Sequence, residues 1–493
     1  MSRRPASPLV RWTPHVLQPD PGRVVVKTFL PGQELLTLGE SRATGVLERV
    51  QAMTPAEVER TLSATLTSFS PRHRDLPDIL NNRFQLVAHR LPHPGRVSRA
   101  RRQLIGAYFT QEYAIESAAL FNPSMVAHPD QSGQPDGSVR FLMSVRAVGE
   151  GHVSSVEFRT GSIDGADVVS IDEPDRFTVL PALTPPVYSR AVFAAQLAGI
   201  GAGQDGADYV LGLLGESFGA AELDHAIERL RSQGLTRGPA STTIEHLERI
   251  AACNYSVVFP EGSAMDQRVL IPHSPTESHG MEDVRLVRFT DDDGTVDYRG
   301  TYTAFDGTRI VPQLMRTRDF RSFDISQLGG AAARDKGMAI FPRTVEGRYL
   351  ALSRWDRENN TIASSMDMVC WEEWCVLQTP RQPWEIVHVG NCGPPIETER
   401  GWLVLTHGVG PMREYSMGAM LLDLHDPRVV VGRLREPLIT PRPDDRDGYV
   451  PNVVYSCGGL LHGRTLVLPY GCSDSFIRIA LVDVDALLTR LAP

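Results

Sequence analysis

The sequence lacks long apolar runs. No stretch approaches the roughly 18 consecutive apolar residues that a membrane-spanning helix needs. The first residues, MSRRPASPLVRWTPH, include the arginine pair Arg3-Arg4, but the apolar segment of a secretory signal does not follow this pair. We therefore expect a cytoplasmic protein with no membrane partner.

Cysteine is scarce, and its spacing carries no metal motif. The six cysteines show neither a CxxC pair nor a Cys/His spacing: Cys253, Cys370, Cys375, Cys392, Cys457 and Cys472. No His, Asp or Glu cluster has a recognisable ligand spacing either. We expect small buried cysteines, no metal and no cofactor.

An excess of positive charge is also missing, because the formal net charge is −9 and the pI is near 5.9. This balance gives no general attraction to nucleic acid, so a bound anion must be held by a local basic cluster. The 42% hydrophobic and 22% charged residues are typical of a globular protein. A chain of 493 residues indicates two or three compact units, or one repeat architecture with an extension.

Helical patterns occur in two regions. Residues 54–67 begin with Thr54, Pro55 and Glu57, which predicts a capped helix start, and a second helical pattern covers 103–119. Between them lies a basic stretch, 83–102. We expect a helical N-terminal extension over 1–105, a catalytic domain over 106–493, and a helical insert near 208–251.

The remainder is rich in short strands, and one class of strand recurs. It is found at 140–147, 298–307, 348–356, 401–408 and 464–474. The starts at 298, 348, 401 and 464 lie 50, 53 and 63 residues apart, which suits a four-stranded propeller blade. The fold class predicted is all-β, a five-bladed β-propeller with the helical extension and insert; an irregular β-sandwich is the alternative. The strands end in polar groups that we expect to meet at one funnel: Arg146, Asp306, Arg354, His407 and Asp474.

Eight motifs in order resemble glycoside hydrolase family 130, the β-mannoside phosphorylases and related β-mannosidases. They are FNPSMV (121–126), SVRAVGEGH (144–152), GMEDVRLVRF (280–289), GTYTAFDG (300–307), KGMAIFPRTVEGRYLALSR (336–354), GNCGPPIETERGWLVLTHGVG (390–410), GYVPNVVYSCG (448–458) and YGCSDS (470–475). The resemblance covers about 121–480 and implies a five-bladed propeller. The helical N-terminal part resembles extended bacterial members, some of which act on β-1,2-linked oligomannosides.

The acidic pair Glu282-Asp283 lies in the third motif. Neighbouring side chains of a strand point to opposite faces, so we expect one acid of the pair to enter the site. The resemblance implies that Asp283 is the proton donor, acting on the glycosidic oxygen through the 3-hydroxyl of the sugar.

The resemblance also implies the substrate contacts. Lys336, Arg354 and His407 match regions that contact phosphate, with Arg309, Arg316 and Arg343 as further candidates. The positions that match mannose contacts are Asn122, Arg146 and Asp474.

The function predicted is an inverting glycoside phosphorylase that cleaves β-1,2- or β-1,4-mannooligosaccharides with inorganic phosphate, its co-substrate, and yields α-mannose 1-phosphate. Two alternatives stay open: an inverting β-mannosidase, which needs a second carboxylate to activate water, and a carbohydrate-binding propeller without catalysis. The expected partners are a mannose-containing oligosaccharide and phosphate. The oligomeric state is open, and a homo-oligomer is compatible with the sequence.

Overall fold

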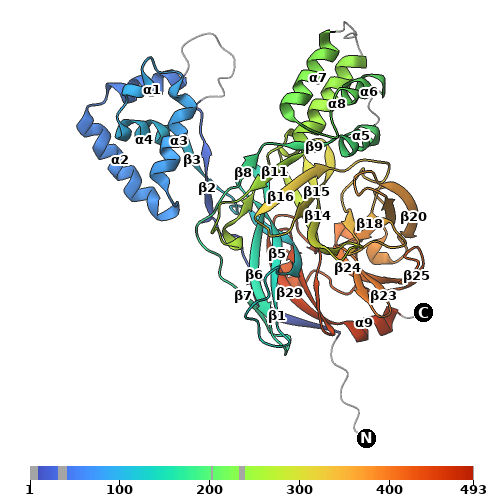
Figure 1. Cartoon of the computed structure of the whole chain (residues 1–493). Coiled ribbons are helices and arrows are strands. Elements are labelled where there is room, and N and C mark those ends of the chain that lie inside the picture. The colour runs from blue at the N-terminus through green and yellow to red at the C-terminus, as the bar shows by residue number, and fades with distance from the viewer. Residues whose placement is uncertain (1–8, 32–41, 201–203, 233–238, 492–493) are drawn as a thin grey trace. The chain divides into compact units, whose positions relative to one another are not determined.

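A computed structural model describes residues 9–31, 42–200, 204–232 and 239–491. Within these residues the fold is mostly β, with some helices (Figure 1). The chain divides into two compact units. The smaller comprises Asp20–Ser117 with Asp175–Val179, and the larger comprises the described residues of 1–19, 118–174 and 180–493.

The smaller unit is helical. Its helices are α1 (Arg42–Ala52), α2 (Pro55–Phe69), α3 (Leu76–Ala88) and α4 (Arg99–Tyr108), beside the strand pair β2 (Val24–Thr28) and β3 (Thr110–Ala114). The predicted capping box is confirmed, because the Glu57 backbone N–H donates to Thr54 Oγ1 and the Thr54 N–H donates to the Glu57 carboxylate. The helix predicted over 103–119 is wrong beyond Tyr108, since the chain continues there as β3 and pairs with β2.

The described residues of the larger unit form four large sheets. The first joins β4 (Ala119–Ala127), β5 (Val139–Val148), β6 (Ser154–Ile163), β13 (Gly280–Thr290), β14 (Val296–Phe305), β15 (Ile310–Thr317), β16 (Ser322–Gln327), β11 (Tyr255–Val258) and β8 (Ala182–Thr184), with β7 (Val169–Ile171) and β12 (Val269–Leu270) on β6. The second joins β17 (Ala339–Ile340), β18 (Tyr349–Ser353), β19 (Asn360–Ser365) and β20 (Glu372–Gln378).

The third sheet joins β21 (His388–Asn391), β23 (Gly401–Val409), β24 (Tyr415–Leu422) and β25 (Val430–Arg433), with β22 (Ile396–Thr398) on β23. The fourth joins β1 (Val10–Leu17), β29 (Phe476–Asp483), β28 (Thr465–Cys472) and β26 (Val454–Tyr455), with β27 (Leu460–His462) on β28. Strands from early and late in the chain thus share one sheet, since Val10 pairs with Val482. Helix α9 (Val484–Leu491) packs on its apolar core.

In the part of the larger unit that the structure describes, four helices interrupt the strands: α5 (Arg190–Gly199), α6 (Gln204–Gly212), α7 (Ala220–Ser232) and α8 (Pro239–Cys253) (Figure 1). They accompany the short pair β9 (Val187–Ser189) and β10 (Ser217–Gly219). Their apolar faces form a core of their own, with Phe193, Val210 and Leu247 almost fully buried. Among the described helices, none is both long and apolar enough to cross a bilayer.

The five recurring strands predicted from the sequence are confirmed as β5, β14, β18, β23 and β28. Asp306 is an exception to the expected convergence of their ends. It follows β14, but its carboxylate accepts hydrogen bonds from the backbone of Thr308 and Arg309 in an exposed turn.

Candidate active site

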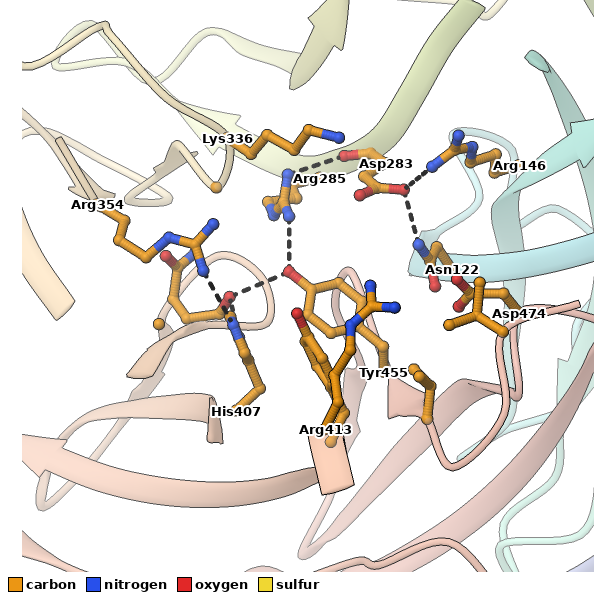
Figure 2. A pocket seen from close by; sticks show the side chains of 16 residues that line it. Asn122, Arg146, Asp283, Arg285, Lys336, Arg354, His407, Arg413, Tyr455 and Asp474 are labelled. Carbon is orange, nitrogen blue, oxygen red and sulfur yellow. Dashed lines mark hydrogen bonds and ion pairs between the residues drawn. The ribbon is translucent and has the colours of Figure 1, made fainter. Parts of the chain in front are cut away.

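One pocket of the larger unit brings together all seven predicted site residues (Figure 2). They come from six strands or their ends and from the loop before β17. The lining residues are Asn122, Arg146, Asp283, Arg285, Lys336, Gly337, Arg354, Gly390, Asn391, His407, Arg413, Tyr415, Val450, Val453, Tyr455 and Asp474. Side chains as far apart in sequence as Asn122 and Asp474 therefore share one site.

Asp283 enters the pocket from a β-bulge. Glu282 pairs with Thr303 and Arg285 with Thr301, so two residues of β13 lie opposite the single Tyr302 of β14. Asp283 has a left-handed φ of 57°, which turns its side chain out of the regular alternation. The bulge aims the carboxylate at Asn122 and Arg146.

Of the two neighbouring acids, only Asp283 lines the pocket, in agreement with the expectation that one acid of the pair enters it, although one arginine joins the two. Arg146 contacts both: its Nη2 lies 2.7 Å from Glu282 Oε1 and its Nη1 lies 3.1 Å from Asp283 Oδ1. Glu282 is not among the lining residues, but it stands directly behind two of them, Arg146 and Lys336. The left-handed residue and the bulge interrupt the regular alternation of β13 at this point.

Cations around Asp283 govern its ionisation. The side-chain amide of Asn122 donates to its Oδ1 at 2.7 Å, and Arg146 donates to the same oxygen. Burial favours the neutral acid, but Arg146, Arg285 and Lys336 outweigh it and lower the pKa of Asp283 to about 2. Without substrates, the carboxyl group is ionised at neutral pH.

Asp474 is the second carboxyl group of the pocket and is perturbed in the opposite direction. It lies in the tight turn between β28 and β29, with a φ of 48°. Burial raises its pKa to about 7, assisted by the nearby carboxylates of Asp283 and Glu282, while Arg146 and Arg413 oppose the rise. Asp474 therefore exchanges its proton near neutral pH.

The part of the pocket around Arg354 and His407 is cationic. Arg354 Nη1 lies 3.4 Å from His407 Nε2, and its Nη2 lies 3.4 Å from Asp335 Oδ2. Burial and the cations Arg354 and Arg285 hold the pKa of His407 well below its usual range, as does His388. The ring is thus neutral, and its Nδ1 donates to the backbone carbonyl of Asn391 at 3.2 Å. His407 contributes hydrogen bonding here, and the arginines and Lys336 supply the charge.

Sequence reasoning missed several lining residues. Arg285 is fully buried, donates to the Asp283 carbonyl and contacts the Tyr455 hydroxyl at 2.7 Å (Figure 2). Arg285 follows Asp283 by two residues, but the β-bulge between them breaks the rule that residues i and i+2 share a face, so the spacing gave no signal. Asn391 is 1% exposed, and neither of its side-chain amide atoms has a partner among the described residues. No spacing pattern indicated Asn391 or Arg413.

The further phosphate candidates do not line the pocket. Arg316 pairs with Asp297, and Arg343 pairs with Glu397 at 2.7 Å. Arg309 also lies outside the lining set. Within the described part of the chain, no three His, Cys, Asp or Glu side chains gather in a way that could hold a metal ion.

Comparisons with known proteins point to one family. A family model described as beta-1,4-mannooligosaccharide phosphorylase matches residues 260–492. A 1,2-beta-oligomannan phosphorylase of Thermoanaerobacter sp. is 32% identical over 225 residues, which cover 45% of this chain and 74% of that protein. A beta-1,2-mannobiose phosphorylase of Listeria innocua is 31% identical over 229 residues, 45% of this chain and 63% of that protein.

Among solved structures, the β-1,2-mannobiose phosphorylase from Listeria innocua in complex with β-1,2-mannobiose matches with a TM-score of 0.45 and 21% identity. That match covers 77% of this chain and 93% of the other. The family model and the curated relatives agree on the class of enzyme. The chain therefore belongs to glycoside hydrolase family 130 and is an enzyme of the glycoside phosphorylase class.

Proposed function

We propose that this enzyme cleaves β-mannosides with inorganic phosphate in a single inverting displacement and releases α-mannose 1-phosphate. The observation that carries the proposal is one pocket lined both by Asp283 and by three buried or half-buried cations, Arg285, Lys336 and Arg354. An acid is needed to protonate the leaving oxygen, and cations are needed to take phosphate from water and hold it against the anomeric carbon.

The roles follow from the two sides of the pocket. Asp283 donates the proton, and Asn122, Arg146 and Asp474 hold the nonreducing mannose. Lys336 and Arg354 bind phosphate by charge-assisted hydrogen bonds, and the neutral His407 adds a polar contact.

The ionisation of Asp283 couples the two substrates. Its pKa is low because Arg146, Arg285 and Lys336 surround it. Bound phosphate would bring negative charge to the same cations and raise the pKa of Asp283. We infer that phosphate binding helps to load the proton that the acid then gives to the leaving oxygen.

The five-bladed propeller remains part of the proposal. In the first sheet, β6 and β13 meet through a single parallel bridge, Ser154 with Gly280, whereas the strands on either side pair over long antiparallel registers. If the first sheet is divided at this bridge, it forms two blades. The three other large sheets then bring the number of blades to five. The division at residue 105, a homo-oligomer and the cytoplasmic location stay predictions.

The linkage is also a proposal. Both relatives are named for β-1,2-mannosides, which favours that linkage, while the family model is described by β-1,4-linked substrates. We keep β-1,2- and β-1,4-mannooligosaccharides as the two substrate classes.

Product analysis tests the function. The enzyme is incubated with β-1,2- or β-1,4-mannobiose, with and without phosphate, and the products are separated by anion-exchange chromatography and identified by ³¹P NMR. We expect α-mannose 1-phosphate and mannose only when phosphate is present. Mannose released at the same rate in both conditions would indicate hydrolysis, and binding without any product would indicate a carbohydrate-binding protein.

A further inference from the structure

Glu282 is buried behind the pocket, and both oxygens of its carboxylate are engaged by cations. Oε1 lies 2.7 Å from Arg146 Nη2, and Oε2 lies 2.5 Å from Lys336 Nζ. The residue is 5% exposed. Its two partners lie 136 and 54 residues away in the chain. One carboxylate thus joins three distant segments.

The two partners serve different sides of the proposed site. Arg146 also donates to Asp283 through its other terminal nitrogen, so its guanidinium forks between the two acids. Lys336 lines the pocket and was assigned to phosphate. In the view of Figure 2, Asp283 lies between Lys336 and Arg146. A buried carboxylate with two ionic partners is costly to leave unpaired, so its geometry fixes both cations.

We propose that Glu282 is a positioning residue whose carboxylate holds Arg146 and Lys336 on either side of Asp283 and balances their charge. The effect of this role on catalysis rests on the proposed function. Glu282 itself does not line the pocket.

The charges that face Asp283 determine the direction in which its pKa should change when Glu282 is replaced. Its surroundings are Arg146 on β5, Arg285 on β13, Lys336 before β17, Asp474 after β28, and Tyr455 and Cys457 on and after β26. Loss of the Glu282 charge removes the anion that balances Arg146 and Lys336, and it frees Arg146 to turn both nitrogens toward Asp283. Both changes favour the ionised carboxylate, so the acid loses its proton at lower pH.

The first test is the pH dependence of kcat for phosphorolysis with both substrates saturating, since kcat reports the ionisation of the acid in the complex. In Glu282→Gln we expect the alkaline limb to move by about one pH unit toward lower pH. Glu282→Asp keeps the charge, so its alkaline limb should stay near that of the parent.

Glu277→Gln is the matched control. Glu277 is a fully buried glutamate that binds the hydroxyls of Tyr255 and Tyr302 and does not line the pocket. Its variant should lower the melting temperature and leave the alkaline limb in place. An unshifted limb in a folded Glu282→Gln, or an equal shift in Glu277→Gln, would overturn the charge-balancing role.

A second test does not depend on turnover. The sequence contains only two lysines, Lys27 and Lys336, so reductive ¹³C-methylation gives two side-chain signals, and Lys27→Arg assigns them. We expect the Lys336 signal to shift in Glu282→Gln and Glu282→Asp, with the Lys27 signal unchanged. An unmoved Lys336 signal in both variants would overturn the ionic bridge.

The two tests separate the failure of this inference from the failure of the proposed function. If the parent forms no mannose 1-phosphate, the proposed function is wrong. The methyl signals still show whether Glu282 and Lys336 form the ionic bridge. If Glu282→Gln does not fold, the methyl signals of Glu282→Asp test the bridge instead.

Discussion

Three short polar side chains of the pocket share an uncommon backbone conformation. Asn122, Asp283 and Asp474 have φ values of 47°, 57° and 48°. Left-handed residues other than glycine are uncommon, and Asn and Asp tolerate the region best. Such conformations cost of the order of 1–3 kcal/mol and persist where surrounding structure fixes them, often at functional sites. At the residue scale, these three side chains thus enter the pocket from positions where the backbone departs from regular strand geometry.

The acid role of Asp283 predicts a large loss of rate in Asp283→Asn. The amide keeps the shape but cannot donate the proton, so kcat on the natural disaccharide should fall about 10²- to 10⁴-fold. An activated aryl β-mannoside, which needs little protonation, should recover part of the rate. Steady-state kinetics on both substrates measure the effect.

Asp306→Asn is the control for this variant, because Asp306 ends a neighbouring strand in an exposed turn outside the pocket. It should leave the rate unchanged. Retention of more than about a tenth of the parent rate in Asp283→Asn would remove Asp283 from the acid role.

The cationic side predicts a selective loss of phosphate use. Lys336→Ala and Arg354→Ala should each raise the KM for phosphate about 10- to 150-fold, with a smaller effect on the KM for mannoside, because each removes a charge-assisted contact of about 1.5–3 kcal/mol. Arg316→Ala, which removes a half-exposed arginine paired with Asp297, is the control. Unchanged phosphate dependence in both pocket variants would refute the assignment.

The raised pKa of Asp474 predicts a pH-dependent effect on stability. Burial holds the pKa at about 7 in the folded protein, above its value in an unfolded chain. The protonated acid therefore stabilises the folded state at low pH, and this contribution is lost as the pH rises through about 7. Asp474→Asn should be more stable relative to the parent at pH 8 than at pH 5, by about 1–2 kcal/mol after solvent screening. Denaturant unfolding at the two pH values checks this, and a difference independent of pH would contradict it.

At the scale of elements, the sequence patterns predicted what depends on local spacing. The five recurring strands and the capped start of α2 are confirmed because short apolar runs and capping chemistry act over a few residues. The bulge at Asp283 and Val284 was not predicted, because a bulge depends on the partner strand β14. Residues 110–114 became strand for the same reason, since β2 offers them a ladder.

The close approach of β21 and β23 predicts the effect of Gly390→Ala. A Cβ at Gly390 would lie 2.6 Å from His407 Cε1 and 3.4 Å from Arg354 Cδ, so a methyl group must displace the imidazole. We expect the KM for phosphate to rise about tenfold while the melting temperature changes little. Gly95→Ala, where a Cβ would meet nothing within 4 Å, is the control. A parent-like phosphate KM would show that the His407 position is not needed.

At the scale of the whole molecule, the resemblance to a family supplied what periodicity could not. The seven predicted site residues are spread from Asn122 to Asp474, and they meet only because separate sheets contribute to one pocket. Arg285 and Tyr455 were missed because their roles depend on each other, through a hydrogen bond between residues 170 positions apart. Such a pair leaves no local pattern in a single sequence.

The division into two units predicts that the helical unit can be removed without harm to the site. All sixteen lining residues belong to the larger unit. Val24 pairs with Ala114 in an antiparallel ladder, so their Cα atoms lie about 4.5–5.5 Å apart. Replacing 25–113 by Asn-Gly should leave kcat/KM within about threefold of the parent, since such dipeptides close antiparallel pairs.

Deletion of residues 1–100 is the informative comparison, because it also removes β1 from its sheet. We expect it to lower the melting temperature and solubility, unlike the internal replacement. Light scattering on both variants shows whether the helical unit serves assembly. An inactive internal replacement that is folded, or an undamaged deletion of 1–100, would contradict this division of roles.

The pairing of β1 with β29 also has a consequence for biosynthesis. Leu17 finds its partner Ile477 only after 460 further residues have been made. At about 5–20 residues per second, a ribosome needs roughly 25–90 s for that stretch. During this time β1 has an open edge, and Trp12 and Val16 are apolar side chains that stay exposed even when paired. Non-native strands must therefore be prevented from pairing with the open edge of β1 until translation is almost finished.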